Sequence, residues 1–386
     1  MRIRLSLLMV SVLLLASVLT WKSNIQPANA ESTTWIVDDD GPADFHTIQE
    51  AVTAASAGDT IFVNAGLYVE SVTIDKALTL VGEDRDAVIV TTNETLGPYI
   101  FTIEIGAVPR ISGFTFLGNL SIPTAGIGGE CRTIVNNRFL YHFSGIYGLG
   151  RNVSDNIFTD NYRGITLGGT YPQVVTNNEF IGNSVGVLFS LFLSNATVSD
   201  NVFHNNYWGI GSFYFSDVEN TTTISNNIFT FNDEGVAFGD AYDVSVSAYH
   251  NDFINNSIQA RGAGIAASTW DDGYPSGGNY WSNYNGTDLY SGQYQNVSGC
   301  DEIGDMPYVL NLNHTDHYPL MRPYQYMLGD VNRDGKVRID DILTIALAFG
   351  SDHDDLAYRS LMDITGDGKI RIDDILAAVV NFGLGE

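Results

Sequence analysis

Two acidic loops near the C-terminus have the residue types and spacing of a cation site. An EF-type calcium loop takes oxygen ligands at positions 1, 3 and 5, glycine at 6, a backbone carbonyl at 7 and a carboxylate at 12. Residues 330–341 (DVNRDGKVRIDD) and 363–374 (DITGDGKIRIDD) both have this pattern, with the ligand positions held by Asp330, Asn332, Asp334, Lys336 and Asp341, and by Asp363, Thr365, Asp367, Lys369 and Asp374. One such match could be an ordinary Asp-Gly turn. Two matches in the same register predict two Ca²⁺ sites. Because the carboxylates of each loop repel one another without a cation, calcium binding is expected to be coupled to folding of the loops.

An apolar segment that predicts a helix follows each loop. Its spaced apolar residues are Ile342, Ala346 and Phe349 after the first loop, and Ile375, Val379 and Phe382 after the second. No helix is predicted before the first loop, which differs from a calmodulin-like pair. Residues 326–386 instead resemble a type I dockerin domain.

The dockerin resemblance implies a protein partner. Dockerins bind a cohesin module of another extracellular protein, and the positions that often carry partner specificity match Ile339 with Asp340 and Ile372 with Asp373. The near identity of the two segments implies two binding orientations related by a pseudo-twofold axis. Two features depart from the dockerin pattern: Arg338 and Arg371 stand at loop position 9, where smaller polar groups are common, and Thr365 is a weaker ligand than Asn332.

The middle of the chain consists of a degenerate repeat. Phenylalanine recurs at intervals of 19 to 26 residues, with Asn two residues before it and Gly six residues after it, at Phe139, Phe158, Phe180, Phe203 and Phe229. The units are too short for helical pairs, so each is expected to form one coil of a solenoid. Coils stacked about 4.8 Å apart place the Phe rings in a column and the Asn amides in a hydrogen-bonded ladder, and both columns are interpreted as structural.

Both ends of this solenoid need a cap, because an open coil exposes apolar cross-section and unpaired strand edge. Thr47 to Glu50 read as a capping box that opens an amphipathic helix. Residues 270–294, which are rich in aromatics and glycine and break the repeat, are expected to form the C-terminal cap.

Two segments resemble known β-helix proteins. Residues 44–83 look like the opening of right-handed parallel β-helix proteins of the pectin-lyase-like kind, and the segments GGNYWSNYNGTDLYSG and DEIGDMPYVLNLNHTDHYPLMRPY look like the tail of the NosD-type family. The predicted fold is therefore an all-β right-handed parallel β-helix at residues 33–325, with an N-terminal capping helix. A small α-helical, EF-hand-like dockerin domain with two calcium loops follows at residues 326–386.

The outward positions of the coils suggest carbohydrate binding. Tyr162, Tyr207 and Trp208 fall at equivalent places, and flat aromatic faces stack on the apolar faces of sugar rings. The alternative is that these are scattered surface or turn residues. Asp233, Glu234 and Arg163 at the same offsets are weak candidates for catalysis by a polysaccharide lyase or O-glycosyl hydrolase. The two acids are adjacent and should point in different directions, whereas the usual hydrolytic pair faces a bond from opposite sides.

Copper binding is a second alternative. His314 and His317, with Met306, Met321 and Met327 nearby, could supply nitrogen and sulfur ligands, as the label of the NosD-type family implies.

Charge and the N-terminus limit where the protein acts. A formal net charge of −27, from 45 acidic and 18 basic residues, excludes nucleic acid as a favoured partner. Residues 1–30, with Arg2 and Arg4 before an apolar run that ends in an A-x-A pattern, predict a signal peptide rather than an uncleaved anchor. The sequence thus predicts a secreted or cell-surface protein, with no membrane span after cleavage, that binds carbohydrate and docks through calcium-dependent contacts to a cohesin-bearing partner.

An oxidising compartment would permit a disulfide between Cys131 and Cys300, although no pattern shows that they meet.

Overall fold

The computed structural model describes residues 32–93, 96–121, 123–169, 171–190, 195–212, 221–238, 245–262, 268–353 and 355–384. The predicted signal peptide lies outside these residues. The chain divides into two compact units, and the predicted boundary near residue 325 falls inside the second, Thr34–Glu386.

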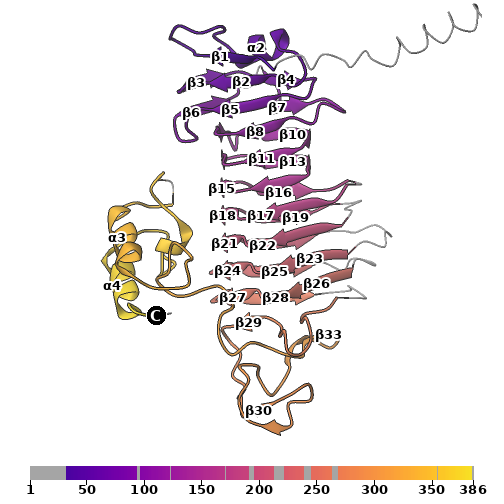
Figure 1. Ribbon diagram of the computed structural model, residues 1–386, viewed down its shortest axis with the longest axis vertical. Coiled ribbons are helices and arrows are strands. Elements are labelled where there is room, and N and C mark those ends of the chain that lie inside the picture. The colour runs from indigo at the N-terminus through magenta and orange to yellow at the C-terminus, as the bar shows by residue number, and fades with distance from the viewer. Residues whose placement is uncertain are drawn as a thin grey trace, which may run out of the picture. The chain divides into compact units, whose positions relative to one another are not determined.

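Three parallel sheets form most of the second unit (Figure 1). In the described residues sheet A contains β1 (Thr34–Val37), β2 (Thr60–Val63), β5 (Thr79–Gly82), β8 (Arg110–Ser112), β11 (Thr133–Val135), β14 (Asn152–Ser154), β17 (Gln173–Thr176), β20 (Ala196–Ser199), β23 (Thr221–Ser225) and β26 (Ser245–Tyr249). Sheet B contains β3 (Gly66–Val69), β6 (Val88–Thr91), β9 (Thr115–Leu117), β12 (Arg138–Leu140), β15 (Ile157–Thr159), β18 (Glu179–Ile181), β21 (Val202–His204), β24 (Ile228–Thr230), β27 (Asp252–Ile254) and β29 (Tyr280–Trp281). Sheet C contains β4 (Val72–Ile74), β7 (Tyr99–Ile103), β10 (Ala125–Cys131), β13 (Ser144–Gly150), β16 (Arg163–Leu167), β19 (Val185–Phe189), β22 (Trp208–Ser212), β25 (Glu234–Phe238) and β28 (Ile258–Gly262).

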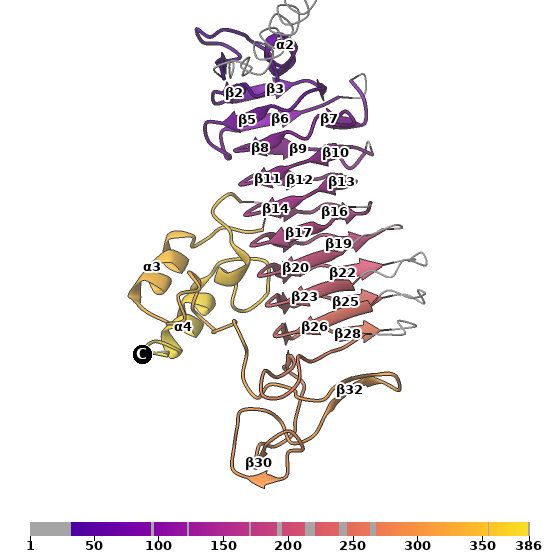
Figure 2. The ribbon, with the colours of Figure 1, turned by 45° about the vertical axis from the view of Figure 1, so that its right-hand side comes forward.

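The chain visits the three sheets in turn, so that each coil adds one strand to each sheet (Figure 2). A strand pairs in parallel with the strand one coil earlier and one coil later; Phe139, for example, pairs with Phe116 and with Phe158. This arrangement confirms the predicted parallel β-helix. Crossovers between parallel strands are expected to be right-handed.

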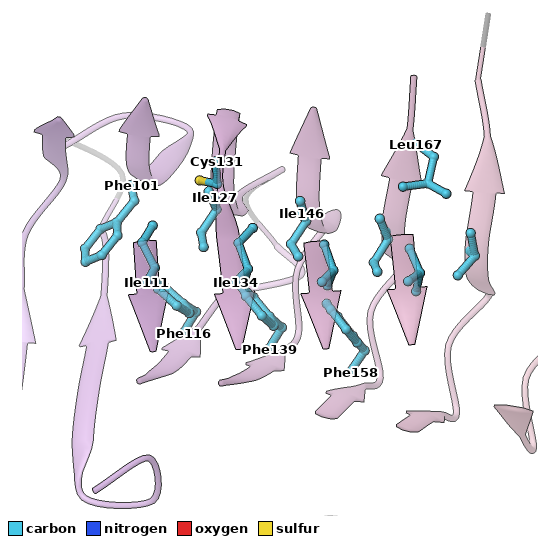
Figure 3. Close-up of a cluster of buried hydrophobic side chains, with 14 of the residues drawn as sticks. Phe101, Ile111, Phe116, Ile127, Cys131, Ile134, Phe139, Ile146, Phe158 and Leu167 are labelled. Carbon is cyan, nitrogen blue, oxygen red and sulfur yellow. The ribbon is translucent and has the colours of Figure 1, made fainter. Parts of the chain in front are cut away.

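The phenylalanine column forms the core of the solenoid. Adjacent rings from Phe116 to Phe253 stack with centroids 4.7 to 4.9 Å apart, and Trp281 continues the stack 4.5 Å beyond Phe253. Figure 3 shows Phe116, Phe139 and Phe158 in line, with the aliphatic column of Ile127 and Ile146 on the facing strands. The glycines six residues after each Phe are needed, since a Cβ at Gly164 would lie 2.9 Å from the Phe180 ring.

Two asparagine ladders run along the solenoid. In the predicted ladder each Asn side-chain oxygen accepts from the backbone N–H and the side-chain amide of the Asn one coil earlier, through Asn137, Asn156, Asn178, Asn201, Asn227, Asn251 and Asn279. A second ladder, which was not predicted from the sequence, lies five residues later and contains Asn161, Asn183, Asn206, Asn232 and Asn256. Every amide is buried and satisfied, so the ladders fix the register of the coils.

The ends of the solenoid are covered. Helix α2 (Ile48–Ala54) begins at the predicted cap Thr47, whose hydroxyl accepts from the Glu50 N–H, and the Glu70 carboxylate accepts from two more N–H groups of its first turn. At the other end the antiparallel pairs β30 (Tyr290–Ser291) with β31 (Val297–Ser298) and β32 (Tyr308–Asn311) with β33 (His314–Asp316) follow the last coils. The first ladder ends on Asp316, which accepts from the Asn279 N–H.

The C-terminal segment forms helix α3 (Ile339–Leu347), a short 3₁₀ turn (Ser360–Met362) and helix α4 (Ile372–Val380). The two helices contact each other, and their buried face is built on Ile345 and Ala378. The predicted apolar positions Ala346, Phe349, Val379 and Phe382 are not buried, because the helices bury the face that begins at the loop aspartates instead. This cluster also contains Ile157 and Ile181 of sheet B.

Candidate functional site

An exposed aromatic stack lies at the edge where the chain enters sheet C. Phe143 and Tyr162 stack with centroids 5.1 Å apart and planes 21° apart, and both rings are more than two-fifths exposed. The Arg163 guanidinium carbon lies 5.1 Å from the Phe143 centroid and 5.4 Å from that of Tyr162, within the range of a cation–π contact. The flat surface therefore has a fixed positive group beside it.

A second aromatic pair continues this edge two coils further along. Tyr207 and Trp208 have centroids 5.6 Å apart, and Arg163 and Trp208 both pair with Val185 of the intervening coil. Two strand spacings correspond to about 10 Å. The Trp208 ring lies over Gly211, where a Cβ would come within 2.7 Å of it, so glycine is needed there. We call Phe143, Tyr162, Arg163, Tyr207 and Trp208 the aromatic stripe; the predicted binding residues Tyr162, Tyr207 and Trp208 all lie on it.

An ion pair follows the stripe in the next coil. Glu234 pairs in register with Trp208, and Arg261 donates to its Oε1 at 2.8 Å. Glu234 is buried, whereas the neighbouring Asp233 is exposed, so the two weak catalytic candidates face different surroundings. Because Glu234 forms an ion pair with Arg261 and Asp233 lies in different surroundings, the two acids do not form the facing pair of carboxyl groups that glycoside hydrolysis needs.

A pocket of about 480 Å³ on sheet C was not foreseen from the sequence. Tyr99 and Tyr147 line it over a floor of glycine backbone, and the Tyr99 ring occupies the place of a Gly128 side chain, 2.5 Å from an added Cβ. Arg151 donates to Glu130 at one end and lies 4.6 Å over the Tyr171 ring. These tyrosines lie outside the Phe repeat; the paired glycines at 128 and 129 were the signal that could have revealed the pocket.

The first predicted calcium loop is closed around its carboxylates. Asp341 is fully buried, and it accepts from the N–H groups of Val331 and Asn332 through Oδ1 and of Arg338 through Oδ2. Gly335 has φ 79°, as the sharp turn at position 6 requires. Burial, and then repulsion from Asp341 and Asp334, raises the pKa of Asp330. The all-oxygen donor set and the excess of carboxylates in this loop fit Ca²⁺.

The second loop repeats this geometry. Asp374 is fully buried and accepts from Thr365 and from the Arg371 N–H, and Gly368 has φ 81°. The position-9 arginines contact the position-5 carboxylates: Arg371 donates to Asp367 at 2.7 Å, and Arg338 lies 3.7 Å from Asp334. These arginines offset part of the charge that a cation would neutralise.

In the described part of the chain, the three carboxylates whose oxygens lie within 4.8 Å of one another are Asp38, Asp39 and Asp40, and the loop carboxylates are not gathered so closely. The carboxylate oxygens of Asp341 and Asp374 instead accept hydrogen bonds from the backbone N–H groups named above. Calcium binding at both loops, including at the Lys336 and Lys369 carbonyls, stays a prediction.

The predicted partner positions are exposed. Ile339 and Ile372 are 59% and 58% exposed, and Leu343 and Leu376 are each 55% exposed. Asp340 and Asp373 are exposed as well. Equivalent residues of the two helices therefore present equal apolar surfaces.

The copper candidates differ in burial and in hydrogen-bond partners. His314 is buried in β33 with Nδ1 2.9 Å from Asn311 Oδ1, whereas His317 is exposed and its Nδ1 lies 2.9 Å from Asp271. Met306 is largely exposed.

The two cysteines do not form the disulfide that an oxidising compartment would permit. Cys131 is buried and Cys300 exposed, and both are free thiols.

Comparisons with known proteins found a family model and a solved structure that are similar to parts of this chain. The family model described as periplasmic copper-binding protein (NosD) matches residues 124–286, less than half of the chain. A pectin methylesterase from carrot has a similar solved structure, with 15% identity, a TM-score of 0.30, and coverage of 64% of this chain and 80% of that one. No curated protein matches the sequence. The sheet topology defines a parallel β-helix, and the family match falls on its middle and later coils. Within the described residues, no helix is both long and apolar enough to cross a membrane.

Proposed function

We propose that this protein binds carbohydrate along sheet C and docks to a cohesin-bearing extracellular partner through its calcium-loop segment. The observation that carries the first role is the aromatic stripe, because exposed rings about 10 Å apart match successive contacts along an extended glycan better than they match a packed core. The pocket between Tyr99 and Tyr147 offers a further aromatic contact on the same sheet.

Binding is favoured over hydrolysis or elimination. Glu234 is paired with Arg261, and Arg163 is packed on two rings, so neither is free to act as an acid or base. The polysaccharide lyase and glycosyl hydrolase alternatives therefore lack a positioned pair of groups here.

The docking role is supported by the duplicated, exposed apolar positions on α3 and α4. Leu343 and Leu376, with the neighbouring Ile339 and Ile372, form two equivalent faces, so the partner could engage either one. Because both helices begin at the loops, Ca²⁺ bound there would order them, and docking should be lost in chelator. An extracellular or periplasmic location agrees with the periplasmic description of the NosD family.

The test is retention of the purified protein on a panel of acidic and neutral glycans. Retention without new reducing or unsaturated ends supports binding, and product formation overturns it. A cohesin pulldown with and without chelator tests docking separately, and glycan retention should not change in chelator.

A further inference from the structure

The first ligand position of the second loop is fully engaged by hydrogen-bond donors. Asp363 Oδ1 accepts from the N–H groups of Gly366 and Asp367 at 2.8 and 3.1 Å. Its Oδ2 accepts from the Gly368 N–H at 2.7 Å and the Tyr358 hydroxyl at 2.8 Å. Since a carboxylate offers about four lone-pair sites, none remains open for a cation.

The same position of the first loop is half open. Asp330 accepts from the Asp334 N–H at 3.1 Å through Oδ1 and from the Gly335 N–H at 2.8 Å through Oδ2. The residue five places before it is Gln325, where the second loop has Tyr358, and the Gln325 amide donates to Asp200 instead. The two loops therefore differ in their surroundings although their sequences are nearly identical.

The solenoid contributes to this difference through His204 at the end of β21. His204 is buried, with Nε2 3.2 Å from the Tyr358 hydroxyl and 3.4 Å from Asp363 Oδ2, and its Nδ1 lies 2.9 Å from the Thr230 hydroxyl. Tyr358 packs in the same buried cluster as Ile181 of sheet B. The second loop is thus held against the solenoid at its first ligand.

We propose that the two calcium sites are unequal: loop 330–341 fills first, and Ca²⁺ at loop 363–374 must displace the Tyr358 and His204 contacts with Asp363. Filling the second loop then loosens the segment around Tyr358 from sheet B. The inference rests on the proposed calcium function and adds a role for a residue of the β-helix in setting metal affinity. A hydrogen bond to a charged group is strong enough to lower the affinity of the second loop about tenfold.

The experiment is a calcium titration of the full chain by calorimetry, for the natural protein, Tyr358→Phe, Asp330→Asn and the exposed control Tyr294→Phe. The natural protein is expected to show two affinity classes, and Asp330→Asn should remove the tighter one. Tyr358→Phe keeps the ring and should tighten the weaker class about tenfold, and Tyr294→Phe should change neither class.

His204→Gln gives an independent version of the test from the solenoid side, with the same direction of change expected. Hydrogen exchange provides the second measurement: amides of residues 355–362 should lose protection at calcium concentrations that fill the weaker class. Equal affinities in the natural protein, or unchanged or weaker binding in Tyr358→Phe, would overturn the proposal. Two classes of the predicted order with no change in exchange would overturn the link to the solenoid. Absence of any calcium binding would instead reject the calcium function on which the proposal rests.

Discussion

Replacing Asp316 with Asn should change how the stability of the β-helix depends on pH. Asp316 ends the first asparagine ladder: its Oδ2 accepts from the Asn279 N–H and the Trp281 indole, and its Oδ1 accepts from the Tyr318 N–H. Burial outweighs these hydrogen bonds and raises the pKa of Asp316 from 3.8 to about 7. The folded state therefore holds a proton more tightly than the unfolded chain does.

A raised carboxyl pKa contributes stability that is fully present below the unfolded value and is lost as pH rises through the folded value. The window is pH 3.8 to about 7, and three pH units at 1.36 kcal/mol each amount to about 4 kcal/mol. The amide that replaces the carboxyl group in the Asp316→Asn variant does not titrate. The free energy of unfolding of the natural protein, relative to that of the variant, is expected to rise by about this amount between pH 7.5 and pH 4.

The assay is urea unfolding followed by tryptophan fluorescence at several pH values in that window. Asp155→Asn, at an exposed position with φ 58° that Asn tolerates, serves as the matched control for the loss of one carboxyl group. A difference between the natural protein and Asp316→Asn that is constant across the window would refute the assignment of a raised pKa to this carboxyl group.

The remaining predictions concern the core and the loops. Asn201→Ala removes three donated and two accepted hydrogen bonds inside the ladder and should lower the free energy of unfolding by about 3–5 kcal/mol. The control Thr197→Ala, on the neighbouring strand, should lower this free energy by less than about 0.5 kcal/mol. Denaturant unfolding measures both changes. Phe180→Ala opens a gap in the ring stack and should cost about 3–5 kcal/mol in the same assay, and a loss below about 1 kcal/mol would show that the stack is not a continuous core. Chelator should lower the melting temperature of the natural protein but not of a variant carrying both Asp341→Asn and Asp374→Asn, as calorimetry would show; an equal effect on both would mean that the loops do not bind the metal.

The β-helix could be predicted because its determinants repeat. The same pattern of residues recurs around Phe139, Phe158, Phe180, Phe203 and Phe229. Because successive coils stack in register, equivalent residues of neighbouring coils lie over one another. The second asparagine ladder has an equally regular signal in the sequence, since its members follow those of the first by five residues.

Other features depend on residues far apart in the sequence and have no repeating signal. Glu70 caps a helix that begins 22 residues earlier, and Tyr358 meets His204 across 154 residues. Helical spacing predicted an apolar helix after each loop, but it did not show that the loop aspartates Asp341 and Asp374 lie on the buried face of α3 and α4. Spacing identifies an apolar stripe but does not say which of two stripes the neighbouring elements cover.

Glycan retention by the aromatic stripe tests the central claim most directly. Affinity electrophoresis of the natural protein and of a variant with Tyr162→Ala, Tyr207→Ala and Trp208→Ala should be run on the same glycan panel, with Tyr294→Ala as the control. We expect at least one glycan to retard the natural protein and the control by the same factor, with no product released, and the triple variant to migrate as it does without glycan. Retardation of the triple variant equal to that of the natural protein would contradict the account.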